Sequence, residues 1–245
     1  WQWLLGDSAT TGSTTSPAGS LASTSIVADA GHFSVMTYTG SGANATVGHG
    51  LGAAPTMVLI KNLETAENWL AWHEGLTSAQ YFLNLNTTGA EFDNGASGYF
   101  RGTAPNATVI TMNDSSYNTS SRDYIAYCFK SVAGVCKVGT YEGNNNANGT
   151  YVNLGFTPAF FMAKNIDATG SWFIIDNKRG FNSASNEAYL QAESNTTETV
   201  GNVADLLSDG VKWRTTGGGN ASNTFIYIAM ADIGGNGTLP PVYGR

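Results

Sequence analysis

The chain has 245 residues, a net charge of −7 and a hydrophobic share of 42%, which is enough apolar material for two cores of ordinary domain size. Its 11 Lys and Arg residues are scattered singly. Because nucleic-acid binding depends on clustered cations, we expect no nucleic-acid partner. No apolar run approaches the length of a transmembrane helix, so we also expect no membrane insertion.

The N-terminal residues 1–31 predict an extended arm or linker. Trp1-Gln2-Trp3 are typical of an aromatic strand, and the Ser, Thr, Ala and Gly residues that follow include almost no large apolar side chain. The sequence begins without Met or a signal-like segment, so we expect that it starts inside a longer precursor or was processed.

The next hundred residues contain short apolar blocks separated by turn-forming residues. With 30 glycines and a charged share of 12%, the composition favours turn-rich β structure. Such blocks predict six or seven strands in this part of the chain, and their density favours a β-sandwich. The blocks are residues 33–38, 56–60, 69–72, 81–85, 108–112 and 122–130.

The sequence then repeats itself at a nearly constant distance. Four landmarks return 103 residues later, namely Tyr38 as Tyr141, Pro55 as Pro158, Lys61 as Lys164 and Trp69 as Trp172. The offset grows to 109 in the middle of the copies and returns to 101 in their closing strands. A repeat of this length is a whole domain rather than a solenoid unit.

We therefore predict an all-β fold of tandem duplicated, jelly-roll-like β-sandwich domains with an extended N-terminal arm. The first sandwich covers residues 32–134, the second covers residues 135–233, and a C-terminal tail covers residues 234–245.

No set of residues predicts catalysis or metal binding. His32, His49 and His73 are dispersed and lack zinc-type spacing, so structural or surface roles are the default. There is no Gly-x-Ser-x-Gly elbow. The second copy does not clearly repeat the acids of the first, so the sequence predicts no catalytic residues, no cofactor and no metal. The acids considered are Glu64, Glu67, Glu74, Glu91 and Asp93.

The residues that persist in both copies indicate structure. We predict Trp69 and Trp172 as equivalent core anchors rather than ligand-stacking residues. Lys61 and Lys164 are predicted to guard sheet edges rather than to contact ligands.

Cysteine and asparagine add two further expectations. We predict buried free thiols rather than a disulfide for Cys128 and Cys136, because small oxidised scaffolds usually carry more than two cysteines. The second copy has Ala229 at the position of Cys128, so the pair is not part of the repeated design. Nine Asn-x-Ser/Thr sequons occur, a mild excess that follows the composition. They are at Asn44, Asn86, Asn106, Asn113, Asn118, Asn148, Asn195, Asn220 and Asn236.

Several of these segments together resemble a repeat domain of structural and tail-fibre proteins of marine bacteriophages. The resemblance covers residues 33–233 and is closer in the first copy, since the second has lost the Gly-His-Gly sequence around His49. It supplies no catalytic residues. The segments that carry it are residues 33–40, 47–55, 61–69, 85–88 and 123–129.

The resemblance implies a virion component, and the low-charge tandem sandwich agrees with it. We expect a non-enzymatic phage fibre or appendage module that is extracellular, forms a homo-oligomer, associates with other virion or filament subunits, and contacts a host-surface glycan or protein. Recognition is expected in residues 74–105 and 178–219, where the copies differ. The alternatives are a secreted or surface-displayed filament subunit of cellular origin and, third, a polysaccharide-binding or depolymerase domain.

Overall fold

The computed structural model describes residues 14–16, 18–28, 30–114, 116–179 and 188–232. Within these ranges every regular element is a β-strand, which confirms the prediction of an all-β, sandwich-like fold. The described ranges contain no helix with the length and apolarity of a membrane span. The chain divides into two compact units, Trp1–Ser131 and Val132–Arg245, three residues before the division predicted after residue 134.

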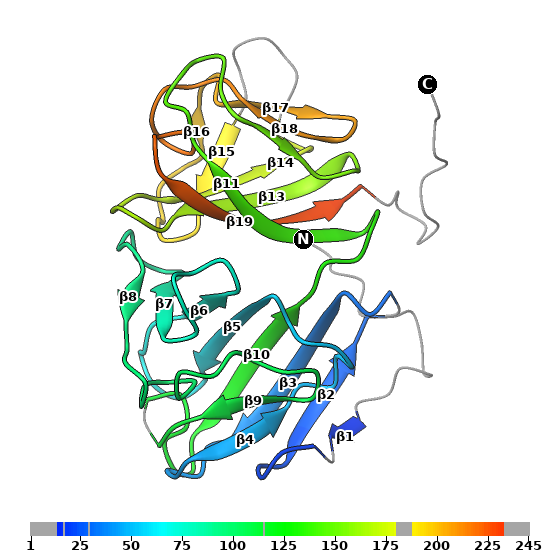
Figure 1. Cartoon of the computed structure of the whole chain (residues 1–245), viewed down its shortest axis with the longest axis vertical. Coiled ribbons are helices and arrows are strands. Elements are labelled where there is room, and N and C mark those ends of the chain that lie inside the picture. The colour runs from blue at the N-terminus through cyan, green and yellow to red at the C-terminus, as the bar shows by residue number, and fades with distance from the viewer. Residues whose placement is uncertain (1–13, 17, 29, 115, 180–187, 233–245) are drawn as a thin grey trace. The chain divides into compact units, whose positions relative to one another are not determined.

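Among its described residues, the first unit has ten strands in two sheets (Figure 1). The larger sheet has the order β1-β2-β3-β10-β5-β6-β7-β8, and β4 pairs with β9 in the smaller one, which Figure 1 shows in front of β3 and β10. The strands are β1 (Thr14–Ser16), β2 (Ser23–Val27), β3 (Phe33–Thr39), β4 (Ala45–Gly48), β5 (Met57–Asn62), β6 (Leu70–His73), β7 (Tyr81–Asn84), β8 (Phe92–Asp93), β9 (Val109–Met112) and β10 (Asp123–Phe129).

The second unit repeats this plan with nine strands in the part of it that the structure describes. Its larger sheet has the order β11-β19-β13-β14-β15-β16, and a three-stranded sheet has the order β12-β18-β17. The strands are β11 (Cys136–Glu142), β12 (Tyr151–Asn153), β13 (Pro158–Asn165), β14 (Trp172–Asp176), β15 (Ala188–Gln191), β16 (Thr199–Val200), β17 (Ala204–Leu207), β18 (Gly210–Trp213) and β19 (Thr224–Ala231).

The core of the second unit lies between its two sheets. In the second unit, Tyr141 and Phe161 of the larger sheet belong to the same buried cluster as Leu206 and Trp213 of the smaller one. The order β3-β10-β5-β6-β7 corresponds to β11-β19-β13-β14-β15. The 103-residue repeat therefore corresponds to a repeated strand order.

The predicted linker is wrong for part of the N-terminal region. Strand β2 pairs with the outer edge of β3, from Ser23 opposite Tyr38 to Val27 opposite Ser34, and β1 pairs with β2. The core side of β2 carries the buried Ser23 and Ser25 and only one large apolar residue, Val27 at its end, so β2 lacks the apolar alternation that marks most strands. Trp1-Gln2-Trp3 and the predicted tail at residues 234–245 lie outside the described residues.

Candidate functional site

Asn118 ties two loops of the first unit together. Its side chain is fully buried between the loop after β3 and the loop before β10. Its Nδ2 atom lies 2.6 Å from the carbonyl oxygen of Ala43 and 2.7 Å from that of Asn113, and its Oδ1 accepts a hydrogen bond from the amide of Ser41. One uncharged side chain thus satisfies backbone groups that have left the sheets.

Asn220 makes the same connection in the second unit. It is also fully buried, and its Nδ2 atom lies 2.9 Å from the carbonyl oxygens of Asn146 and Thr215. Its Oδ1 accepts from the amides of Asn144 and Thr150. We call this arrangement around Asn118 or Asn220 the asparagine lock.

A tyrosine supports each asparagine lock. Tyr38 stacks on Tyr124 with ring centroids 5.1 Å apart, and Tyr141 stacks on Phe225 at 5.0 Å. The hydroxyls of Tyr38 and Tyr141 donate to the carbonyl oxygens of Tyr117 and Gly219, the residues that directly precede the two asparagines. The two tyrosines are apparent in the sequence as repeated landmarks, whereas Asn118 and Asn220 stand out there only as sequons. One sequence signal could have identified Asn118 and Asn220 as equivalents. They are 102 residues apart, which lies between the repeat offset of 103 at the early landmarks and the offset of 101 at the closing strands.

The repeated Lys-Asn pair shapes the loop that follows a central strand. Asn62 Oδ1 accepts from the amides of Glu64 and Thr65. Asn165 Oδ1 makes the equivalent contacts with the amides of residues 167 and 168. Both asparagines therefore cap a turn with their side chains.

The prediction that Lys61 and Lys164 guard sheet edges is wrong, because β5 and β13 are interior strands. Lys61 Nζ donates to the carbonyl oxygen of Glu67 at 2.7 Å, and Lys164 Nζ donates to that of Asn165 at 2.7 Å. Burial lowers the pKa of Lys164 to about 8, and the Glu193 carboxylate partly opposes this shift.

All three histidines are buried, and the side chains of His49 and His73 make hydrogen bonds at separate places in the first unit. His49 is fully buried, with Nε2 placed 3.0 Å from the carbonyl oxygen of Asn106 and Nδ1 accepting from the amide of Leu51. Burial lowers the pKa of His49, and the contact with Asn106 opposes this. Since a carbonyl can only accept, Nε2 carries the proton of a neutral ring.

His73 explains one difference between the copies. Its Nδ1 accepts from the amide of Gly75 at 2.8 Å. Asp176, which stands 103 residues later, accepts from the amide of Lys178 at 2.8 Å. Imidazole and carboxylate therefore perform the same turn-capping task.

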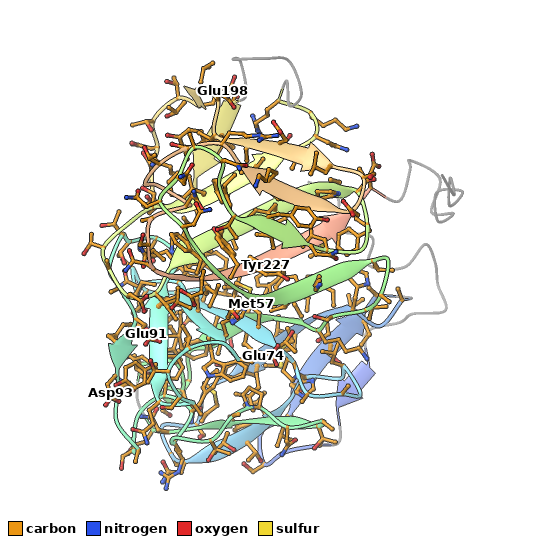
Figure 2. The ribbon with its side chains drawn as sticks, turned by 45° about the horizontal axis from the view of Figure 1, so that its top comes forward. Met57, Glu74, Glu91, Asp93, Glu198 and Tyr227 are labelled. Carbon is orange, nitrogen blue, oxygen red and sulfur yellow. The ribbon has the colours of Figure 1, made fainter. Side chains whose placement is uncertain are left out.

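The acids considered from the sequence also have local contacts. Glu64 pairs with Arg122 at 3.3 Å, and Asp93 accepts from the amide of Gly95. Glu91 accepts from the amide of Thr77. Figure 2 shows Glu91 and Asp93 near β8 and Glu74 apart from them. Burial raises the pKa of Tyr99, and the Glu67 carboxylate adds to the shift.

The cysteine prediction is confirmed, since Cys128 and Cys136 are free and buried. The prediction of a buried core anchor is right for Trp172 and wrong for Trp69. Trp172 is buried with an exposed fraction of 1%, whereas Trp69, at the equivalent register position, is half-buried beside Tyr127.

A depression of about 480 Å³ lies in the first unit at one end of β2, β3 and β10. Its exposed side chains come from neighbouring strands: Thr24 is opposite Thr37, and Thr39 is opposite Asp123. Leu63 lies next to Asp123, because the Leu63 amide donates to the Asp123 carbonyl oxygen at 2.9 Å. The second unit has no strand equivalent to β2 among its described residues, since β11 is at the edge of its sheet.

Within the described ranges, no three His, Cys, Asp or Glu residues form a group that could hold a metal ion. The family described as Domain of unknown function (DUF7483) matches residues 1–233 of the chain. Comparison with the curated proteins and with the solved structures gave no match.

Proposed function

We propose that this chain, which belongs to the family described as Domain of unknown function (DUF7483), is a non-enzymatic structural module of an extracellular appendage. The leading setting is a bacteriophage fibre that contacts a host-surface glycan or protein. The sequence resemblance is the reason for naming a virion rather than another extracellular assembly.

The observation that carries the proposal is the duplication of the asparagine lock. Asn118 and Asn220 occupy equivalent positions, and each is supported by a tyrosine hydroxyl on the preceding carbonyl. The residues kept in both copies hold backbone in place, as a scaffold requires. Uncharged buried hydrogen bonds of this kind are insensitive to salt, which suits a module exposed to changing media.

Assembly is part of the proposal. A fibre module gains strength by presenting several copies of a weak contact, because the effective concentration of the second contact is high. We therefore expect a homo-oligomer associated with other virion subunits. The chain would be located in the virion appendage.

The test is to locate the chain on native particles. Antibodies raised against the purified chain should label phage appendages in immunogold electron microscopy, with particles from a phage that lacks the gene as the control. Labelling of filaments on cells free of phage would instead support a cellular filament subunit. Turnover of host polysaccharide by the purified chain would contradict the non-enzymatic proposal.

A further inference from the structure

We propose that the depression at the end of β2, β3 and β10 binds a neutral hexose unit of a glycan. This inference deepens the proposed function by naming the ligand class of one surface. The depression lies outside residues 74–105 and 178–219, where the sequence predicts recognition.

Strand pairing decides which side chains face the depression. Ser23, Tyr38 and Tyr124 form one row across the sheet, and their side chains are buried in the core. Side chains alternate between the two faces of a strand. The neighbouring residues Thr24, Thr37, Thr39 and Asp123 are accordingly exposed on the outer face.

These residues offer the groups that a sugar needs. The hydroxyls of Thr24 and Thr37 can each donate and accept, and the Asp123 carboxylate can accept from sugar hydroxyls. Thr39 Oγ1 donates to Asp123 Oδ1 at 2.7 Å, which orients the carboxylate. Among the described residues, no hydrogen bond to Asp123 Oδ2 occurs, so this oxygen can receive a sugar hydroxyl.

An apolar wall completes the site. Leu63 has an exposed fraction of 56% and stands beside Asp123, where it can contact the C–H face of a sugar ring. Ala22, which is exposed, also lines the depression. A depression of about 480 Å³ lies within the size range of small-ligand sites.

Charge favours a neutral sugar over an acidic one. Asp123 lines the depression, and the nearby Arg122 guanidinium already pairs with Glu64 at 3.3 Å. A sugar carboxylate would therefore face the negative charge of Asp123. The Arg122 guanidinium would not offset this repulsion, because it is already paired with Glu64.

The experiment is an NMR titration of the full ¹⁵N-labelled chain. The probes are the methyl α-glycosides of glucose, galactose and mannose, each to about 100 mM, a range that detects millimolar affinity. Glucuronate, glycerol and calcium chloride are the comparison probes. We expect saturable shifts of amides in β2, β3 and β10 with at least one glycoside, and weaker or no shifts with glucuronate.

Two variants test the geometry. Asp123→Asn should weaken binding roughly fivefold by removing a charged acceptor, and Thr37→Trp should abolish it by filling the depression. The matched control is Glu142→Gln, because Glu142 lies opposite Thr224 in the equivalent row of the second unit. It should bind as the unaltered chain does. Far-UV circular dichroism and thermal unfolding confirm that each variant is folded.

Four outcomes would overturn the inference: no saturable shift with any glycoside, equal shifts with glycerol, the same shifts with calcium alone, or undiminished binding by folded Asp123→Asn. If no sugar binds, the labelling of appendages by antibodies is unaffected. If the chain is absent from appendages, the result of the sugar titration is unaffected. The two proposals can therefore fail separately.

Discussion

Asn118 and Asn220 are structural equivalents, each fully buried with a side-chain amide between a loop after the first repeated strand and a loop before the last. Their neighbours differ: Ser41, Gly42 and Ala43 in one unit correspond to three asparagines in the other. The contacts survive because they are made mainly to backbone atoms. A loop can therefore change its side chains while the lock is retained.

Replacement of either asparagine by aspartate should destabilise its own unit. Asn118→Asp and Asn220→Asp remove the amide donors and place a carboxylate against carbonyl oxygens. We expect a loss of roughly 3 kcal/mol in the free energy of unfolding, measured by urea titration. Asn44→Asp is the control, because Asn44 is exposed, and it should change stability by less than about 0.5 kcal/mol. Equal stability of all three variants would show that the lock contributes little.

Two glycines should be intolerant of alanine for the same reason. A Cβ atom on Gly40 would collide with the Thr119 carbonyl oxygen, and one on Gly143 with that of Ala221. Both obstacles are backbone atoms next to the asparagine locks, so we expect Gly40→Ala and Gly143→Ala to lower unfolding stability by about 1–3 kcal/mol. Gly201→Ala, which meets open space without a positive φ, is the control. Wild-type stability of Gly40→Ala would argue against this close packing.

The sequence predicted the strands whose apolar residues alternate or run together. The blocks at residues 33–38 and 122–130 became β3 and β10, and the block at residues 56–60 became β5, within two residues at most ends. The duplication also predicted that a second set would follow. These predictions succeed because a buried strand requires apolar residues in an alternating or continuous run, and such a run is visible in the sequence.

Strand β2 could not be predicted in this way. Its buried Ser25 packs against Gly50, where a Cβ atom would collide with the Ser25 side chain. Only small side chains fit such a close approach, so β2 lacks the hydrophobic pattern of a strand. The depression depends on β2 and was missed with it. The asparagine locks were missed because a buried asparagine and an exposed sequon look alike in sequence.

The two repeated tryptophans should differ in their effect on stability. Trp172 is buried, so Trp172→Ala should cost about 3–5 kcal/mol of unfolding free energy as a large core truncation. Trp69 is half-buried and has a ring centroid 6.0 Å from that of Tyr127, so Trp69→Ala should cost less than about 2 kcal/mol. Chemical denaturation of both variants measures the difference. Equal costs would contradict the burial of the two side chains.

Both cysteines should be unreactive in the folded chain. Burial raises the pKa of Cys128 and of Cys136 to about 12, and the thiolate is the form that attacks disulfide reagents. We expect almost no reaction with Ellman's reagent at pH 8 until denaturant is added, after which both thiols react. Rapid labelling of the native chain would show that at least one thiol is accessible. Added reductant should leave the thermal midpoint unchanged.

Stability should fall as the pH drops below the ordinary pKa of histidine, in part because of His49. Burial lowers the pKa of His49 from 6.5 in the folded chain, so above pH 6.5 the ring is neutral in both states and no penalty arises. Below pH 6.5 the unfolded chain takes up a proton that the folded chain does not, and unfolding becomes easier by up to roughly 1.4 kcal/mol per pH unit.

His49→Asn keeps an acceptor for the Leu51 amide and removes the titrating ring. The comparison is urea unfolding of both proteins at pH 7.5, 6.5 and 5.5. Carboxylates contribute equally to the two, so the variant should show the shallower fall, and identical pH dependence would mean that His49 protonates as readily in the folded chain as in the unfolded one.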